Sequence, residues 1–173
     1  TGVQTCALPI SAGTALDPGG IGKGLAADLV VEEFVEHECD GLLVALGGDV
    51  TVAGRAPDGN GWVVSVLDPT SSVELDRMHL DRGSLATSSS EIRVFGRGHH
   101  LIDPFTTSPT ANGVRGATAV ARTGAWAEAL TKPLMIVGRS MLGPYDERGV
   151  AAMVVDLEGR HVNDAWRKMA VPA

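Results

Sequence analysis

Four glycines and one lysine lie between positions 17 and 25, directly before an apolar pattern of helical spacing. A glycine-rich turn that leads into a helix presents free backbone N–H groups and the positive end of the helix dipole at one place. Such a place suits an anion such as a phosphate, and Lys23 adds a mobile positive charge. The segment therefore predicts an anion-binding turn, although a plain turn before a helix explains the glycines equally well.

The segment differs from two common phosphate-binding motifs. A P-loop needs Gly-x-x-x-x-Gly-Lys followed by Ser or Thr, whereas Gly24 follows Lys23 here. The dinucleotide fingerprint also fails, because the third glycine of the alternating series Gly20, Gly22 and Gly24 comes one position early. A P-loop phosphotransferase is therefore the weaker alternative for this turn.

A second group of residues suited to chemistry lies at 100–104, which read His-Leu-Ile-Asp-Pro. A histidine of ordinary pKa can take a proton from a hydroxyl group at neutral pH, so His100 is a candidate base. A single histidine in a loop is more often structural than catalytic. Asp103 either orients His100 or caps the turn through its side chain.

The composition narrows the class of protein. The 173 residues suffice for one domain with a sizeable core, and the formal net charge of −7 argues against a nucleic-acid-binding surface. Three Trp, one Tyr and three Phe are too few for extensive stacking on bases. The sequence holds no apolar run of about eighteen residues, so it predicts no transmembrane segment.

Residues 1–10 look like a translated sequencing adapter. They contain no initiator Met, no basic stretch and no long apolar stretch, so they do not resemble a signal peptide. On this interpretation Cys6 is foreign, and Cys39 alone cannot form an internal disulfide. We expect residues 11–173 to be the C-terminal part of one domain.

The elements that position these residues follow from apolar spacing and turn residues. We expect a helix over 22–37 and an antiparallel meander over 42–67, with a buried strand at 42–46 and a further strand at 62–67. Residues 68–79 read as a polar connection.

The second half alternates strands and helices irregularly. We expect weak strands at 80–87 and 91–95, a strand at 117–121, a helix at 124–137 and a terminal hairpin over 151–162. No linker or repeat divides the chain. The pattern therefore predicts a single α+β domain, with a largely antiparallel sheet and flanking helices.

Five segments together resemble one protein family. They read Asp-Pro-Gly-Gly-Ile-Gly-Lys-Gly at 17–24, Leu-Gly-Gly-Asp at 46–49, Ala-Thr-Ser-Ser at 86–89, His-Leu-Ile-Asp-Pro at 100–104 and Glu-Ala-Leu-Thr-Lys at 128–132. Their order and spacing resemble the ApbE-type FAD:protein FMN transferases over about residues 14–157. The resemblance implies the T-fold-like ApbE architecture, with the N-terminal portion missing from this chain.

The resemblance also implies a reaction. These flavin transferases move FMN from FAD onto a Thr or Ser hydroxyl of a target flavoprotein, with AMP as the leaving group and usually with Mg²⁺. The implied partners are FAD and an acceptor flavoprotein. Many members are exported and membrane-anchored through an N-terminal segment, and a cytoplasmic form is the alternative, so the compartment of this chain stays unassigned.

The resemblance assigns roles to residues of this sequence. The expected catalytic residues are His100, Asp103 and Lys23. The expected FAD-binding residues are Asp17, Gly19, Gly20, Gly22, Lys23, Leu25, Asp28, His100 and Ile102. The expected metal site consists of the Gly22 carbonyl, Glu128, Thr131 and Lys132. Two interpretations of Asp28 stay open, because it either orients the ligand or is a first-turn acid favoured by the helix dipole.

Three positions depart from the family pattern. The family has Asp and Thr as magnesium ligands where this chain has Glu128 and Lys132, and a protonated Lys has no lone pair for a metal. The two residues either form a surface ion pair at i,i+4, or the Lys132 ammonium partly takes over the charge of the metal. Thr107 replaces a usual Gly, so its turn lacks a residue suited to positive φ. Pro133 should kink or shorten the helix at 124–137.

Two further functions remain as alternatives within the same resemblance. A degenerate FAD-binding protein without transferase activity fits the altered metal residues. An FAD pyrophosphatase would instead hydrolyse FAD to FMN and AMP.

Overall fold

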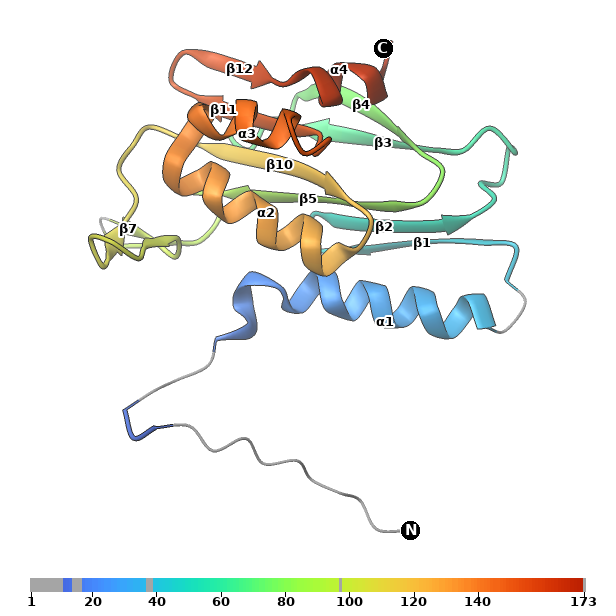
Figure 1. Ribbon diagram of the computed structural model, residues 1–173, viewed down its shortest axis with the longest axis horizontal. Helices are drawn as coiled ribbons and strands as arrows, with labels where there is room; N and C mark the ends of the chain where they lie inside the picture. Colours follow the sequence, from blue (N-terminus) through green and yellow to red (C-terminus); the bar gives the residue numbers. More distant parts are fainter. Residues whose placement is uncertain (1–10, 14–16, 37–38, 97, 173) are drawn as a thin grey trace.

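The computed structural model describes residues 11–13, 17–36, 39–96 and 98–172. The interpretation of residues 1–10, with Cys6, lies outside this part of the chain. Within it, the chain forms a six-stranded antiparallel sheet, a smaller three-stranded sheet and helices packed against them (Figure 1). The expected α+β class with a largely antiparallel sheet is confirmed.

The six-stranded sheet has the strand order β1-β2-β5-β10-β11-β12, and each strand is antiparallel to its neighbour. Its strands are β1 Gly41–Leu46, β2 Asp49–Gly54, β5 Gly83–Ser89, β10 Gly116–Ala121, β11 Ala152–Asp156 and β12 Gly159–Val162. Side chains alternate between its two faces, so Ala117 and Ala119 of β10 lie in one core cluster while Val120 lies in the other.

Different layers cover the two faces of this sheet. On one face, α2 (Gly124–Val137) packs its buried Leu134 and Met135 against the sheet. On the other face lie β3 (Trp62–Leu67), β4 (Glu74–Leu80), β13 (Ala170–Val171) and α4 (Asp164–Met169), with Met78 and Trp166 in the core between them. The short η2 (Gly138–Met141) and α3 (Leu142–Asp146) connect α2 to β11.

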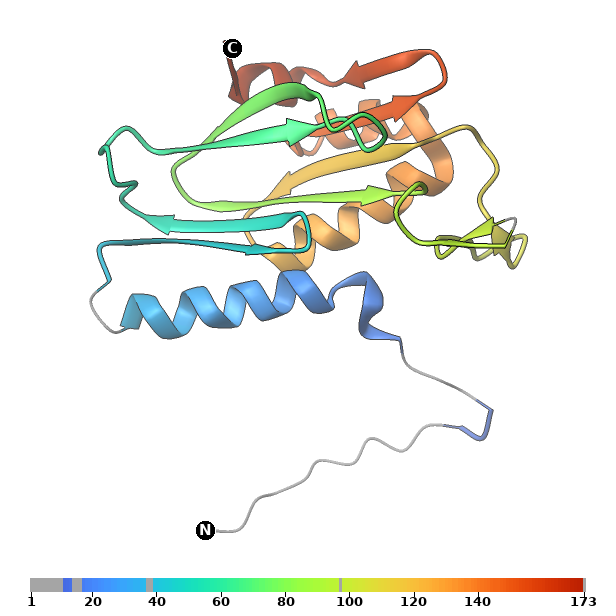
Figure 2. The same ribbon diagram turned by 180° about the vertical axis from the view of Figure 1, so that it is seen from behind.

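The first helix, α1 (Gly22–Glu36), confirms the expected helix over 22–37 and follows the one-turn η1 (Pro18–Gly20). This helix lies along β1 and β2 at the edge of the sheet, and the N-terminal end of α1 crosses α2 (Figures 1 and 2). No helix in the described part of the chain is long and apolar enough to cross a membrane.

The expected meander over 42–67 is wrong in its third strand. β1 and β2 pair as expected, but β3 pairs with β4 in the smaller sheet. The expected polar connection over 68–79 therefore contains a strand. Its charged residues concealed the pattern, since Met78 and Leu80 are buried whereas Arg77 and His79 are partly exposed.

Three strands also differ from expectation, one in its burial and two in their bounds. The run 42–46 is not buried, because β1 is an edge strand and Leu43 is exposed. The expected strand over 80–87 is split, since Leu80 ends β4 and β5 begins at Gly83. Only Val94–Phe95 (β6) of the expected strand 91–95 is extended and paired.

The helix over 124–137 has the expected bounds and continues through Pro133, so the expected shortening is wrong. Side chains from other elements bind carbonyls of α2 near the proline. The Tyr145 hydroxyl donates to the Leu130 carbonyl at 2.8 Å, and the Asn112 amide donates to the Met135 carbonyl at 2.9 Å. These bonds satisfy helix carbonyls and support the last turns.

Two short ribbons lie between β5 and β10. β6 pairs with β7 (Gly98–His99), and β8 (Ile102–Asp103) pairs with β9 (Ser108–Pro109). Figures 1 and 2 show that they project beyond one end of the six-stranded sheet. The terminal hairpin over 151–162 is confirmed as β11 and β12.

Candidate active site

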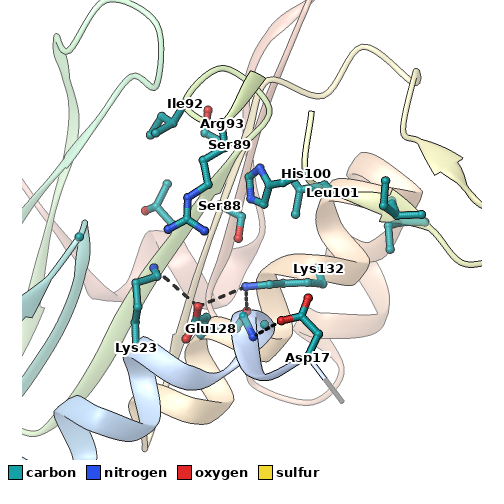
Figure 3. Close-up of a pocket in the computed structure, with 16 residues that line it drawn as sticks. Asp17, Lys23, Ser88, Ser89, Ile92, Arg93, His100, Leu101, Glu128 and Lys132 are labelled. Atoms are coloured by element: carbon teal, nitrogen blue, oxygen red, sulfur yellow. Dashed lines mark hydrogen bonds and ion pairs between the residues drawn. The ribbon is translucent and has the colours of Figure 1, made fainter. Parts of the chain in front are cut away.

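A cavity of about 430 Å³ lies where the start of α1, the end of β5 and the middle of α2 meet the ribbons. Its lining comes from segments far apart in the sequence (Figure 3). Among the lining residues are Asp17, Gly19, Gly20 and Lys23, then Ser88 and Ser89, then Arg93, His100 and Ile102, and finally Glu128 and Lys132.

Two glycines let α1 and α2 cross at close range. A Cβ atom on Gly24 would lie 2.1 Å from the Gly124 carbonyl oxygen, and a Cβ atom on Gly124 would lie 2.4 Å from the Gly24 carbonyl oxygen. A side chain at either position would push the helices apart, because close-packed atoms leave no room for it. The crossing places Lys23 of α1 beside Glu128 of α2.

Glu128 is the buried carboxylate of the site, with only 2% of the residue exposed. Its Oε2 accepts the Gly24 N–H at 2.9 Å. Its Oε1 lies 3.6 Å from Lys23 Nζ and 3.7 Å from Lys132 Nζ (Figure 3). Glu128 and Lys132 therefore belong to a charge cluster around a buried carboxylate and do not form an isolated surface ion pair.

Asp49, at the start of β2, holds Lys23 from a second side. Lys23 Nζ donates to Asp49 Oδ2 at 2.5 Å, and the Thr87 N–H donates to Asp49 Oδ1 at 3.1 Å. Burial raises the pKa of the Asp49 carboxyl, and the bond from Lys23 opposes that rise. Asp49 was not among the expected site residues, although its Leu-Gly-Gly-Asp segment carried part of the resemblance.

Lys132 is fixed by its own helix. Its Nζ donates to the Glu128 carbonyl oxygen at 3.0 Å, and its side chain is 26% exposed. Burial lowers the pKa of the Lys132 ammonium, while the charges of Glu128 and Asp49 raise it. An ammonium group is thus held at the cavity wall with part of its surface open to a ligand.

The hydroxyl of Thr131 lies beneath the cavity wall and does not line the cavity. It donates to the Glu128 carbonyl oxygen at 2.7 Å. Since its proton is engaged there, the Ser88 hydroxyl, at 2.5 Å, is the donor in the bond between Ser88 and Thr131. The Thr131 hydroxyl therefore donates one hydrogen bond and accepts one inside the protein.

The turn before α1 has several of the expected contacts with the cavity. Asp17 Oδ1 accepts the Gly19 N–H at 2.8 Å and caps η1. Gly19 and Gly20 line the cavity, whereas Gly22 and Leu25 do not. Leu25 is 44% exposed on α1.

Asp28 joins the two helices. Its carboxylate accepts the N–H groups of Gly124 at 2.6 Å and Ala125 at 2.9 Å, at the start of α2. These are N–H groups that a helix leaves without internal partners, and the charge lies at the positive end of the α2 dipole. The dipole that favours Asp28 is therefore that of α2 and not that of its own helix.

His100 and Arg93 come from the ribbons and face Lys23 and Lys132 across the cavity (Figure 3). Burial lowers the pKa of His100 below its usual value of 6.5. The charges of Arg93 and Lys132 lower this pKa further, while a hydrogen bond with the Arg93 backbone raises it. His100 is therefore neutral at pH 7, the state in which an imidazole can accept a proton.

His99 has a structural role in the same segment. Its Nδ1 accepts the Leu101 N–H at 3.2 Å, so its Nε2 carries the proton and donates to the Thr110 carbonyl at 3.0 Å. Both ring nitrogens are engaged in holding the ribbons. Of this pair, His100 is the residue that lines the cavity.

Asp103 caps the turn that follows it. Its Oδ1 accepts the Phe105 N–H at 2.8 Å, and its carbonyl accepts the Thr107 N–H at 2.8 Å. Of the two roles left open for Asp103, the structure contains the cap. Thr107 has a φ of 55°, so the turn does use a positive φ at the position where the family usually has Gly.

The donor set of the expected metal site does not fit Mg²⁺. Magnesium needs several oxygen ligands at about 2.1 Å, whereas the free oxygen of Glu128 lies between two ammonium groups. The Thr131 hydroxyl is already engaged, and Lys132 supplies no lone pair. Within the described ranges, no group of three or more His, Cys, Asp or Glu side chains could hold a metal ion.

Sequence reasoning missed two charged residues of the cavity region. Asp49 gave a signal, since it ends the Leu-Gly-Gly-Asp segment of the resemblance, but its partner Lys23 lies on another element. Arg93 gave none, because its approach to His100 depends on the path of the ribbon and not on a local pattern.

Comparison with known proteins identifies the family of this chain. The ApbE family model matches residues 5–154. The chain belongs to the ApbE family. The FAD:protein FMN transferase of Treponema pallidum is 30% identical over 141 residues, which cover 73% of this chain and 39% of that protein. The FAD:protein FMN transferase of Vibrio cholerae is 27% identical over 142 residues, which cover 79% of this chain and 40% of that protein.

Solved ApbE structures have the same fold. The ApbE protein of Thermotoga maritima has a TM-score of 0.84 and 26% identity, covering 91% of this chain and 54% of that chain. The flavinyl transferase ApbE of Pseudomonas stutzeri, in its apo form, has a TM-score of 0.76 and 26% identity, covering 89% of this chain and 53% of that chain. This ApbE chain spans about two fifths of the length of the curated relatives it matches.

Proposed function

We propose that this chain holds the diphosphate of FAD and the catalytic histidine of an FMN transfer reaction. The reaction moves FMN from FAD to a Thr or Ser hydroxyl of a flavoprotein and releases AMP. One observation carries the proposal: Lys23 and Lys132 face a neutral His100 across one cavity. The names of the relatives support the same reaction.

The cationic side of the cavity matches the charge of a diphosphate. Lys23 and Lys132 are fixed by Asp49 and Glu128, so little side-chain entropy is lost when they bind an anion. The backbone of Gly19 and Gly20 allows the ligand to approach closely, since it carries no side chain. Fixed charges of this kind stabilise negative charge that develops as the diphosphate is cleaved.

The proposed reaction is a substitution at the phosphorus of the FMN half of FAD. The acceptor oxygen forms a bond to this phosphorus, and the bond from the phosphorus to the bridging oxygen breaks. AMP leaves with the electron pair of the broken bond. His100 takes the proton of the acceptor hydroxyl, and the Asp103 cap positions His100 by holding the adjacent turn.

Mass spectrometry of an acceptor flavoprotein, incubated with FAD and the full-length protein, tests this function. We expect the acceptor to gain the mass of one FMN on a Thr or Ser. Release of FMN and AMP without acceptor labelling would instead establish the pyrophosphatase. FAD binding with neither reaction would establish the degenerate binder, and a preference for ATP over FAD would favour the P-loop-like alternative.

A further inference from the structure

The ammonium group of Lys132 occupies a defined position in the FAD site. Its Nζ is bonded to the Glu128 carbonyl and lies 3.7 Å from Glu128 Oε1. The stem of the side chain runs beside the turn before α1, since a Cβ on Gly20 would lie 3.7 Å from Lys132 Cε. The head of the lysine is thus held by Glu128, and its stem passes beside the backbone of Gly20 at the border of the cavity.

A second ammonium group lies on the other side of the same carboxylate oxygen. Lys23 Nζ is 3.6 Å from Glu128 Oε1 and is also bonded to Asp49. Two ammonium groups together carry the same charge as one Mg²⁺ ion. A magnesium ion bound to Glu128 Oε1 would therefore lie next to two positive charges and would be repelled by both.

The remaining side-chain oxygen atoms of the expected metal site do not compensate for this repulsion. Glu128 Oε2 is bonded to the Gly24 N–H, and the Thr131 hydroxyl is bonded to Ser88 and to the Glu128 carbonyl. A divalent cation would have to displace these bonds or Lys132 to gain ligands. The lysine pair, in contrast, is held in place by Asp49 and Glu128 and needs no added ion to present two ammonium groups at the cavity.

We propose that the lysine pair around Glu128 takes the place of magnesium, so that this protein binds the FAD diphosphate without a divalent metal. The inference rests on the proposed function and concerns its cofactor requirement. Lys132 is the decisive residue, because it stands where the family has the oxygen ligand Thr. Lys23 supplies the second charge from α1.

Titration of the full-length protein with FAD, in excess EDTA and then in millimolar MgCl₂, tests the proposal without any variant. We expect the two dissociation constants to agree within about twofold. FMN transfer should likewise persist in EDTA. A dissociation constant that rises about tenfold or more in EDTA and recovers with MgCl₂ would overturn the proposal, and the transferase function would stand.

Two substitutions at Lys132 sharpen the test. Lys132→Met removes the charge and offers no oxygen, so we expect FAD binding about tenfold weaker in both buffers. Lys132→Thr offers a hydroxyl oxygen beside Glu128. We therefore expect this variant to bind FAD more weakly in EDTA and to recover its FAD affinity in MgCl₂. Lys168→Met, on an exposed turn of α4, is the matched control and should bind FAD like the wild type.

Thermal denaturation with MgCl₂ alone gives a readout independent of FAD. We expect no change in the melting temperature of the wild type and a rise for Lys132→Thr. A magnesium-dependent rise in the wild type, or wild-type FAD affinity in Lys132→Met, would contradict the proposal. If the wild type binds no FAD and transfers no FMN in either buffer, the proposed function itself is wrong and the inference fails with it.

Discussion

The two sides of the cavity are built in different ways. On the side of α1 and α2, the charged groups rest on a close helix crossing, and Glu128 is almost completely buried. On the side of His100, the chain forms strands of two residues next to Phe105, which is 90% exposed. In the proposed function the charge of the ligand is held by the core of the fold, whereas proton transfer is assigned to a projecting segment that can vary with less effect on stability.

Substitution of Gly124, at the crossing of α1 and α2, should have the largest effect on the stability of that side of the cavity. In Gly124→Val, the new Cβ would lie 2.4 Å from the Gly24 carbonyl oxygen, so the helices must separate. We expect a loss of about 3 kcal/mol in the free energy of unfolding, at the upper end for overpacked sites. Urea denaturation followed by circular dichroism measures it.

Gly143→Ala in α3 is the control for this experiment. An added Cβ there meets no atom within 4 Å, and we expect a change of less than about 1 kcal/mol. Equal stability of the two variants would contradict the close crossing of α1 and α2.

The pH dependence of FMN transfer tests the role of His100 on the other side of the cavity. The neutral imidazole of His100 is the proposed base, and its pKa lies below 6.5. The rate with saturating FAD should be constant near pH 7 and fall about tenfold per pH unit once the pH is below that pKa. A rate that continues to rise well above pH 7 would indicate a different base. In His100→Gln, the fall of the transfer rate at low pH should disappear.

Asp49→Asn, on the side of α1 and α2, separates the positioning of Lys23 from the stability of the fold. Burial raises the pKa of Asp49, so its charge is not a net source of folding free energy, and the partly exposed Lys23 keeps Glu128 Oε1 at 3.6 Å. We therefore expect the free energy of unfolding to change by less than about 1 kcal/mol. Lys23 loses its short ion pair, and FAD binding should weaken about three- to tenfold. Urea denaturation and FAD titration measure the two effects, and unchanged FAD binding would show that Asp49 does not position Lys23.

The smallest effect is expected in the turn beside His100. Thr107 has a positive φ, a backbone region that disfavours residues with a Cβ. Thr107→Gly should raise the free energy of unfolding by about 0.5–1 kcal/mol, and Thr106→Gly, whose backbone needs no such φ, should lower it. A destabilised Thr107→Gly variant would show that the hydroxyl of Thr107 outweighs the strain.

Local sequence patterns predicted single helices and strands better than they predicted which strands pair with one another. The helix at 124–137 was predicted with its bounds, because its apolar residues follow helical spacing. In the structure the Thr123 side chain caps its start. The partner of β3 could not be predicted, because strand pairing depends on contacts across the whole chain. The strand β4 was missed, since Arg77 and His79 separate its buried residues.

The site was predicted residue by residue but not as a set of contacts. The motifs pointed to Lys23, His100 and Glu128, which the fold brings to one cavity. The contact of Asp28 with α2 could not be inferred, because its partners Gly124 and Ala125 lie about a hundred residues later in the chain. Side chains that bridge distant elements leave no local pattern in a single sequence.

Parallel measurement of FAD affinity and FMN-transfer rate, for Lys23→Met and His100→Gln in the full-length protein, examines the difference between the two sides. We expect Lys23→Met to raise the dissociation constant of FAD about tenfold or more, because a fixed charge is lost. We expect His100→Gln to leave this constant within about twofold and to slow transfer about 10²- to 10⁴-fold. Weakened FAD binding in His100→Gln with an unchanged transfer rate from bound FAD would contradict the assignment of proton transfer to the ribbon side.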